Sequence, residues 1–432
     1  MKILQNISKV VSKLLENQVE KKDTQYRYIS YCVSSSIPGG MLLYNTLTQE
    51  LLQVSNDELT TSNTKAFLVE HWFLVPLEFD DYSLYDNLYS CLSSLHSEKG
   101  IGKYTILTTT HCNARCAYCF ENNRIQSSMT DDTAQLVSQF IQRNHNGKPV
   151  LLRWFGGEPL VNQRAIEIIT RSLSESDIPY YSSMVTNGYL FNHNNIKEAA
   201  TKWHLKQVQI TLDGCEKEYN QTKNYVNAVG SPYQTVLTNI DGLLHENIHV
   251  EIRLNISQSN PPELMRLVDE LSDRFGSNDL LNIYPSFLVE LKSSLSEKEI
   301  QQYASLQNRI SDAGYAASKA SLSQSLPLNR CMADDPGSIV INPDGYLSKC
   351  EYAYHSDWCG NISSDAINRD IASKWCQRSY PDESCKTCAL RPLCLPLRHC
   401  VENGSCSKAI KSVRMIDLKQ KMYYKYRKSI DK

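Results

Sequence analysis

Between residues 102 and about 290, short β-like runs alternate with amphipathic helical runs, and this alternation limits the possible folds more than any other feature of the chain. The strand candidates are rich in β-branched and aromatic residues and span 104–109, 150–155, 180–186, 207–212, 250–256 and 281–289. Runs with a 3.6-residue apolar period fill the intervals, and one begins after Thr130 with two aspartates in its first turn. Six such units predict an α/β fold with a parallel sheet covered by helices, either open or curled into a partial barrel.

Polar and glycine-containing segments follow or end these strands, where the chemistry of parallel sheets collects. The segments include Gly156-Gly157-Glu158-Pro159, Thr186-Asn187-Gly188, Asp213 with Gly214, and Arg253 with Asn255. Paired glycines let a backbone approach a ligand closely, and the Glu158 carboxylate can accept from an ammonium group. A forked Arg253 guanidinium suits a carboxylate ligand. Each feature alone is also typical of an ordinary turn or surface, so the prediction rests on their order along the chain.

Cys112, Cys116 and Cys119 follow the first predicted strand with the spacing CxxxCxxC, and Tyr118 precedes the last of them. Three thiolates so close in sequence can hold three corners of a four-iron cluster, whereas an electron carrier normally supplies a fourth cysteine. One iron would then stay open for another ligand. The alternatives are a zinc site, which prefers four ligands, or three buried thiols.

Composition limits where such a cluster could work. The chain has 432 residues and a net charge of −2, so it predicts two or three domains and gives no general reason to expect nucleic acid or a membrane surface as a partner. We expect a cytoplasmic protein, because no apolar run has the length of a membrane span and the start lacks the apolar core of a signal peptide. The basic segment 407–432 is expected to be a terminal helix with a solvated face, with an acidic partner as the alternative.

The cysteine spacing, the GGEP sequence and the strand-end polar residues together resemble the radical SAM superfamily. The resemblance implies a partial (β/α)6 radical SAM barrel in which the open iron of a [4Fe-4S] cluster is chelated by S-adenosyl-L-methionine. An electron from the cluster then yields a 5′-deoxyadenosyl radical, so that the cofactors carry the difficult chemistry. The residues implied in cofactor binding are Tyr118, Gly156, Gly157, Glu158, Pro159, Thr186, Asn187, Asp213, Arg253 and Asn255.

Nine of the fifteen cysteines lie between Cys331 and Cys406, and in a reducing compartment such clustering favours metal or cluster ligation. The spacing, with Gly345 before Cys350 and CxxC at 385–388, resembles the SPASM domain, which usually houses two auxiliary four-iron clusters. By this resemblance, one cluster is held by Cys385, Cys388, Cys394 and Cys406, and the other by Cys331, Cys350 and Cys400.

Two features of this cysteine pattern leave its ligands open. Five residues separate Cys394 from Cys400, where the family usually has three, so the role of Cys400 is in question. The set of Cys331, Cys350 and Cys400 also lacks a fourth ligand, and either Cys359 completes it or an iron stays open for a substrate atom. Zinc is the alternative metal, since paired CxxC sequences also occur in zinc ribbons.

Residues 1–100 carry none of this chemistry. A β-like run at 28–33, a Pro-Gly-Gly turn at 38–40 and runs at 41–48 and 50–54 predict a three-stranded meander followed by helices, with another extended segment at 73–78. This arrangement resembles the small winged-helix-like module with which peptide maturases add a leader peptide to a sheet edge. A structural cap on the core is the alternative.

The sequence therefore predicts a peptide-recognition region at 1–100, a radical SAM core at 101–290, a helical connector at 291–330 and a SPASM domain with a C-terminal helix at 331–432. The resemblance implies three [4Fe-4S] clusters, a ribosomal precursor peptide with its leader as substrate, and a flavodoxin or ferredoxin as electron donor. The expected products are thioether or carbon–carbon cross-links. The alternatives are a sulfatase-maturase type enzyme that forms formylglycine and a non-catalytic iron–sulfur electron carrier. Tyr118, Cys215 and Glu290 are acid or base candidates by position only.

Overall fold

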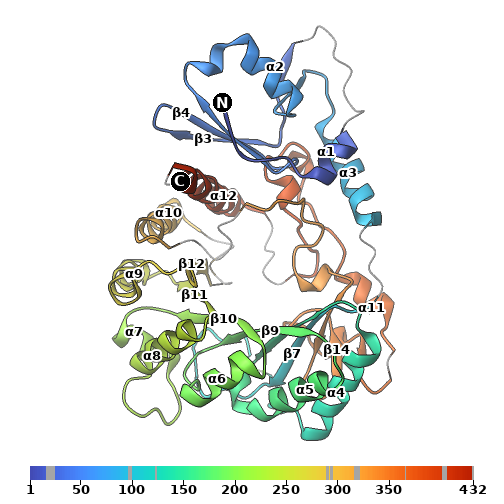
Figure 1. Cartoon of the computed structure of the whole chain (residues 1–432), viewed down its shortest axis with the longest axis vertical. Helices are drawn as coiled ribbons and strands as arrows, with labels where there is room; N and C mark the ends of the chain where they lie inside the picture. Colours follow the sequence, from blue (N-terminus) through green and yellow to red (C-terminus); the bar gives the residue numbers. More distant parts are fainter. Residues whose placement is uncertain are drawn as a thin grey trace.

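The computed structural model describes residues 1–15, 25–95, 100–121, 124–288, 291, 295–315, 322–364, 366–400 and 406–430. Figure 1 shows an N-terminal unit at one end of the molecule and a larger helix-covered sheet at the other, with the C-terminal third of the chain running between them. Within the described part of the chain, no helix is both long and apolar enough to cross a membrane.

The large sheet has nine strands in the order β12-β11-β10-β9-β8-β7-β13-β14-β15. Its first six strands follow one another in the chain and pair in parallel; they are β7 (Lys103–Thr109), β8 (Val150–Gly156), β9 (Tyr180–Thr186), β10 (Leu205–Leu212), β11 (His249–Ile256) and β12 (Leu281–Phe287). All six strands expected from the sequence are confirmed, and so is the α/β class. The uninterrupted strand order brings the carboxyl ends of these strands to one edge of the sheet.

Helices connect the parallel strands and cover the sheet, as Figure 1 shows. They are α4 (Asp131–Asn144), α5 (Gln163–Glu175), α6 (His193–Thr201), α7 (Glu216–Lys223), α8 (Pro232–His245) and α9 (Pro261–Phe275). In α4 the Thr130 side chain caps the first turn, where two aspartates suit the positive end of the helix dipole. Apolar faces of all six helices join the strands in one core.

Three C-terminal strands extend this sheet beyond β7. β13 (Ser338–Ile341) pairs with β7 in parallel, and β14 (Tyr346–Ser348) and β15 (Gly360–Asn361) continue the sheet in antiparallel pairs. Elsewhere in the described part of the cysteine-rich region, the regular structure before α12 consists of α11 (Arg369–Lys374) and several short 3-10 turns. Because β13 lies directly beside β7, the region after residue 331 is joined to the strand that leads into the first cysteine loop.

The N-terminal unit contains a four-stranded antiparallel sheet in the order β1-β5-β4-β3. Its strands are β1 (Lys2–Gln5), β3 (Cys32–Ile37), β4 (Gly40–Asn45) and β5 (Glu50–Ser55). The remaining elements are α1 (Lys9–Leu15), α2 (Ser62–Glu70), α3 (Asp81–Leu95) and a two-stranded ribbon of β2 (Tyr26–Tyr28) and β6 (Leu74–Pro76). The expected meander is confirmed as β3-β4-β5, but the single strand expected at 28–33 is wrong, since β2 ends at Tyr28 and β3 begins at Cys32.

Two long helices tie the ends of the molecule together. α12 (Lys408–Ile430) buries Leu418 and Met422 against the N-terminal sheet, and on another side it contacts α10 (Glu297–Asp312). The Asp417 carboxylate on α12 accepts from the Tyr303 hydroxyl at 2.5 Å and from the Gln307 amide at 2.9 Å. The helices expected in the connector and at the C-terminus are therefore present. In Figure 1, α12 lies between the N-terminal sheet and α10.

Candidate active site

The first cysteine loop leaves the carboxyl end of β7. Its turn is held by the Cys119 amide, which donates to the Cys116 carbonyl at 3.1 Å, and by the Ala114 amide, which lies 3.4 Å from the Cys112 sulfur. Burial raises the pKa of the Cys112 thiol to about 12, and Glu158, Cys116 and Cys119 add to this effect. The three thiols are thus close enough to act on one another, and a bound cation would be needed to hold them as thiolates.

The cysteine loop offers three thiols to a metal or cluster and is tied to the end of β9. Within the described residues, no three Cys, His, Asp or Glu side chains are arranged around one metal-ion position. In a four-iron cluster each thiolate binds a different iron, so the sulfurs can lie farther apart. The side-chain amide of Asn187 donates to Asn113 Oδ1 at 2.7 Å and lies 3.9 Å from the Cys112 sulfur, which ties the end of β9 to the loop.

The GGEP segment at the end of β8 braces the cysteine loop. The Gly157 amide donates to the Thr109 carbonyl at 3.0 Å, and the Glu158 amide donates to the His111 carbonyl at 2.9 Å. A Cβ atom on Gly157 would lie 2.4 Å from the His111 carbonyl oxygen, and one on Gly156 would lie 2.1 Å from that of Thr109. The two glycines therefore permit backbone-to-backbone contact with the loop, which differs from the close approach to a ligand that the sequence predicts.

Glu158 does not offer its carboxylate to a ligand in the way the sequence predicts. The side chain is fully buried. One of its carboxylate oxygens accepts from the Thr186 hydroxyl at 2.7 Å, and the other accepts from the backbone amide of Asn187 at 2.8 Å. Burial raises the pKa of Glu158 to about 7 despite these hydrogen bonds. Glu158 and Thr186 thus join the ends of β8 and β9, and Pro159 is buried beside them.

Asp213, expected to face a ribose, instead forms a buried ion pair with Lys223. Lys223 Nζ lies 3.0 Å from an Asp213 oxygen and 2.9 Å from the Tyr118 hydroxyl, and that hydroxyl donates to both Asp213 oxygens. Burial alone would lower the pKa of Lys223, but the nearby Asp213 and Tyr118 raise it well above its usual value. The sequence does not predict a site role for Lys223, because a lysine in the polar helix α7 carries no periodic signal of burial.

Arg253 and Asn255 lie near the end of β11 and retain hydrogen-bonding atoms for a ligand. The Arg253 Nη2 donates to the Ser286 hydroxyl at 3.2 Å, but its Nε is buried and has no partner among the described residues. In the same part of the chain, Asn255 Oδ1 and Asn113 Nδ2 are also buried without partners. Such atoms are costly unless a bound molecule satisfies them. A forked cation together with amide donors and acceptors suits an amino acid ligand such as the methionine part of S-adenosylmethionine.

Of the acid and base candidates, the structure describes Tyr118 and Cys215, and these two have different partners. The Tyr118 hydroxyl is held by Asp213 and Lys223, as described above. The Cys215 sulfur lies 4.0 Å from the Glu263 carbonyl on α9, and Glu290 lies outside the described residues.

Four C-terminal cysteines surround one cavity. The cavity has a volume of about 280 Å³, and Cys385, Cys388, Cys394 and Cys406 are among its lining residues. Arg414 on α12 donates to the Cys394 sulfur. A cavity with four thiols and neighbouring cations fits an anionic four-iron cluster with four thiolate ligands. The structure thus brings together the four cysteines that the sequence groups, although they come from three separate segments.

The second C-terminal set consists of Cys331, Cys350 and Cys400. Burial raises the pKa of the Cys350 thiol, and Glu351, Cys331 and Cys400 raise it further, so the three sulfurs share one neighbourhood. Cys350 and Cys400 also pack against the same small apolar cluster around Trp375. Cys359 is different: it is fully buried in the main core, and the charge that acts on its thiol is that of Lys349.

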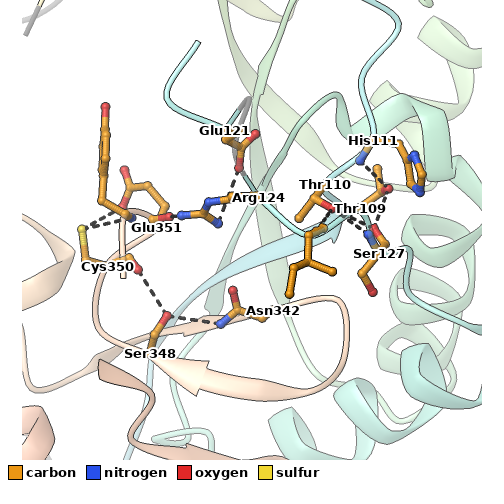
Figure 2. A network of polar contacts seen from close by, with 12 residues as sticks. Thr109, Thr110, His111, Glu121, Arg124, Ser127, Asn342, Ser348, Cys350 and Glu351 are labelled. Atoms are coloured by element: carbon orange, nitrogen blue, oxygen red, sulfur yellow. Dashed lines mark hydrogen bonds and ion pairs between the residues drawn. The ribbon is translucent and has the colours of Figure 1, made fainter. Parts of the chain in front are cut away.

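Polar contacts join the first cysteine loop to the Cys350 loop, as Figure 2 shows. Arg124 forms an ion pair with Glu121 at 3.6 Å and donates to the Glu351 carbonyl. The Phe120 ring stacks on that of Tyr352 with centroids 4.0 Å apart. Residues next to Cys119 therefore contact residues next to Cys350, across more than half of the chain.

Comparisons with known proteins find similar sequences and folds. A family model described as a 4Fe-4S single cluster domain matches residues 98–237. The radical SAM cyclopropyl synthase TigE of Paramaledivibacter caminithermalis is 22% identical over 349 residues, which cover 74% of this chain and 70% of that enzyme.

Two solved structures show the same fold. The structure of anSMEcpe with bound AdoMet and Cp18Cys peptide matches with a TM-score of 0.56 and 15% identity, over 76% of this chain and 98% of that one. Streptococcus suis SuiB bound to its precursor peptide SuiA matches with a TM-score of 0.53 and 12% identity, over 89% of this chain and 100% of that one. The chain is therefore similar in sequence to a radical SAM enzyme, matches a 4Fe-4S single cluster domain over residues 98–237, and shares the fold of anSMEcpe and SuiB.

Proposed function

We propose that this chain binds S-adenosylmethionine at the first cysteine loop and modifies a ribosomally made precursor peptide, installing a thioether or carbon–carbon cross-link. The observation that carries the proposal is the placement of Cys112, Cys116 and Cys119 at the sheet edge that also holds buried, unpartnered atoms of Asn113, Arg253 and Asn255. A four-iron cluster with S-adenosylmethionine, when bound, would supply an adenosyl radical that removes a hydrogen atom from the peptide.

The protein residues would hold and orient these groups. Arg253 would bind the methionine carboxylate through its fork, and Asn255 and Asn113 would satisfy their free amide atoms on the same ligand. Glu158 and Lys223 would act indirectly, because they fix the strand ends and the loop that carry these side chains. Their burial also keeps water from the loop.

The two C-terminal cysteine sets would hold two auxiliary [4Fe-4S] clusters. Cys385, Cys388, Cys394 and Cys406 line a cavity of suitable size, and Cys331, Cys350 and Cys400 form a second, three-thiol site. A flavodoxin or ferredoxin would supply electrons. We assign residues 101–290 to the radical core, 291–330 to a connector and 331–432 to a SPASM domain.

Residues 1–100 would recognise the leader of the precursor peptide by strand addition, in the manner of a small winged-helix-like module. Within the described residues, β3 pairs with β4 on one side only, and its sequence CVSSSI has no charge or proline to block a further strand. The other edge strand, β1, has an irregular register and carries Lys2. The β3 edge is therefore the better docking strand for an extended peptide. SuiB, which shares the fold over 89% of this chain, has been solved with its precursor peptide bound.

A second candidate is oxidation of one peptide Cys or Ser to formylglycine. The structure of anSMEcpe, which shares the fold over 98% of that chain, was solved with a Cp18Cys peptide, and this supports a peptide as the substrate of the second candidate reaction as well. The N-terminal 100 residues argue for the cross-linking enzyme, because a dedicated leader site suits a dedicated precursor.

The test is anaerobic reconstitution with iron and sulfide, followed by dithionite, S-adenosylmethionine and the peptide encoded next to this gene. We expect 5′-deoxyadenosine and a peptide that is lighter by two hydrogens per cross-link. Exchange of one cysteine sulfur for oxygen, or a loss of two hydrogens that leaves an aldehyde at a serine position, would instead support formylglycine formation. No deoxyadenosine from the wild-type chain, with the same result for a Cys112→Ala/Cys116→Ala/Cys119→Ala variant, would refute the proposal.

A further inference from the structure

Arg153 stands in the middle of β8, where a charged residue is unusual. Its chain neighbours Leu152 and Trp154 are fully buried in the core that the helices share with the strands. Because side chains alternate along a strand, Arg153 points to the opposite face of the sheet, in register with Thr105 on β7 and Ser183 on β9. A parallel sheet usually buries apolar side chains on both faces, so a cation at this position indicates a role other than packing.

This face of the sheet forms one wall of a cavity with a volume of about 690 Å³. The segment before β13 forms the other wall, and its Met332 sulfur lies 3.6 Å from the Thr105 hydroxyl. Arg153 comes from the first wall and Arg330 from the second. The cavity therefore lies between the parallel core and the cysteine-rich region, and Cys331 borders it.

The two arginines have no counterion of their own. Both side chains are half-buried, and neither guanidinium forms a hydrogen bond or an ion pair with any residue that the structure describes. The carboxylates nearby are already used. Asp335 pairs with Lys103 at 2.7 Å, and the buried Asp334 pairs with Arg378 at 2.7 Å. The cavity thus carries an excess of positive charge, and its two guanidinium forks suit a carboxylate ligand.

Arg153 is on the strand that ends in the GGEP segment, three residues before Gly156. At about 3.3 Å per residue, it lies about 10 Å along β8 from the segment that braces the first cysteine loop. An extended peptide covers the same distance with about three residues. A peptide that is held at Arg153 would therefore bring a residue about three positions away close to this loop.

We propose that Arg153 and Arg330 bind the carboxylate of an aspartate or glutamate in the precursor peptide and so anchor the peptide beside the first cysteine loop. This inference rests on the proposed function, because it needs a peptide substrate. It adds a selectivity, since the peptide must carry an acidic residue at a fixed distance from the residue that is modified. If the arginines instead balanced only the charge of a cluster at Cys331, the peptide would need no such residue.

The test measures peptide binding without S-adenosylmethionine or dithionite, so it does not depend on turnover. The reconstituted full-length chain is titrated with the fluorescein-labelled peptide encoded next to this gene and with versions in which each Asp or Glu is replaced by Asn or Gln. One of these replacements should weaken binding about tenfold or more, and Arg153→Gln and Arg330→Gln should each weaken binding of the unaltered peptide similarly. When the arginine and the matching acid are both replaced, the loss should be no larger than in either single variant.

Two further variants separate this effect from misfolding and from general charge. Arg153→Lys keeps the charge and the aliphatic stem, so it should recover part of the affinity, which a misfolded chain would not. Arg171→Gln is the matched control and should bind the peptide as the wild-type chain does. Arg171 is an exposed arginine on α5, which covers the other face of the sheet.

Three results would overturn the proposal. The first is equal affinity of the wild-type chain and Arg153→Gln for the peptide, and the second is no binding by the wild-type chain. The third is unchanged peptide affinity together with a lower iron content in Arg330→Gln, which would assign the arginines to the neighbouring cluster. A peptide that binds through the arginines but stays unmodified in the turnover assay would support the anchor and contradict only the proposed reaction.

Discussion

Replacing Lys223 by methionine tests how the first cysteine loop is held. Lys223 is 4% exposed and lies between Asp213 at 3.0 Å and the Tyr118 hydroxyl at 2.9 Å. Methionine has a similar shape but no charge, so Asp213 would stay buried with the Tyr118 hydroxyl as its remaining partner in this group. Burial by itself lowers the pKa of Lys223, but Asp213 and Tyr118 outweigh burial and raise it well above its usual value, so Lys223 is protonated at neutral pH.

The expected loss of stability can be worked out from this burial. Removing one partner of a buried ion pair costs about 3–5 kcal/mol, because the other charge is left uncompensated. Asp213→Asn should cost a similar amount, since it strands the ammonium group. In the double variant both charges are gone, so the combined cost should fall below the sum of the two single costs by about 1–3 kcal/mol.

Hydrogen exchange of the metal-free protein is the suitable assay, because a chain of this size need not unfold in one step. The Arg115 amide donates to the Lys223 carbonyl at 2.9 Å, so its protection reports on the loop directly. Lys217→Met is the matched control, since Lys217 is an exposed lysine on the same helix. Equal protection of the cysteine loop in Lys223→Met and Lys217→Met would refute the argument that the buried pair holds the loop.

Three other predictions concern the site. Gly157→Ala should displace the cysteine loop and lower the iron bound there, because its Cβ would lie 2.4 Å from a carbonyl oxygen, whereas Gly337→Ala, whose nearest atom is 3.4 Å away, should bind normal iron. Burial raises the pKa of Glu158 from 4.5 to about 7, so the protonated carboxyl stabilises the folded protein. This contribution to the free energy of unfolding is complete below pH 4.5 and is lost as the pH rises through 7. Glu158→Gln should lack this part, about 3 kcal/mol, when metal-free unfolding is compared across that range. Cys385→Ser should lose about four irons and Cys376→Ser none, by iron analysis.

The sequence predicts the parallel core because two independent signals agree there. Strands such as Tyr180–Thr186 are apolar runs of the right length, and helices such as α4 carry an apolar period and a capping Thr130. The sequence places the first strand of the N-terminal meander too early, because the apolar run at 28–33 crosses the end of β2 and the start of β3. No local pattern reveals that β13 pairs with β7, because pairing between distant strands depends on the whole fold.

Prediction of the site is limited because a sequence does not show where polar side chains point. Motif spacing gives the residues that meet, as with Cys385 and Cys406, but not the direction in which a polar side chain points. Glu158 and Asp213 lie at the expected strand ends, yet both are committed to protein partners. Polar residues at strand ends must satisfy the buried backbone there as well as any ligand, and only the packed structure shows which demand each one meets.

The cysteine loop is held by buried polar residues that are not themselves expected to bind metal. Three thiols, the Glu158 carboxyl and the Asp213–Lys223 pair are gathered within one buried region, where an uncompensated charge is expensive. A loop that keeps three cysteines in position without metal must therefore be held by groups that do not bind the metal. Glu158 holds it from β8 and β9, Lys223 from α7, and Arg124 connects it to the loop of Cys350. The spacing between the first and the second cysteine site is thus set by protein contacts, so any electron that passes between them would cross a distance fixed by the fold.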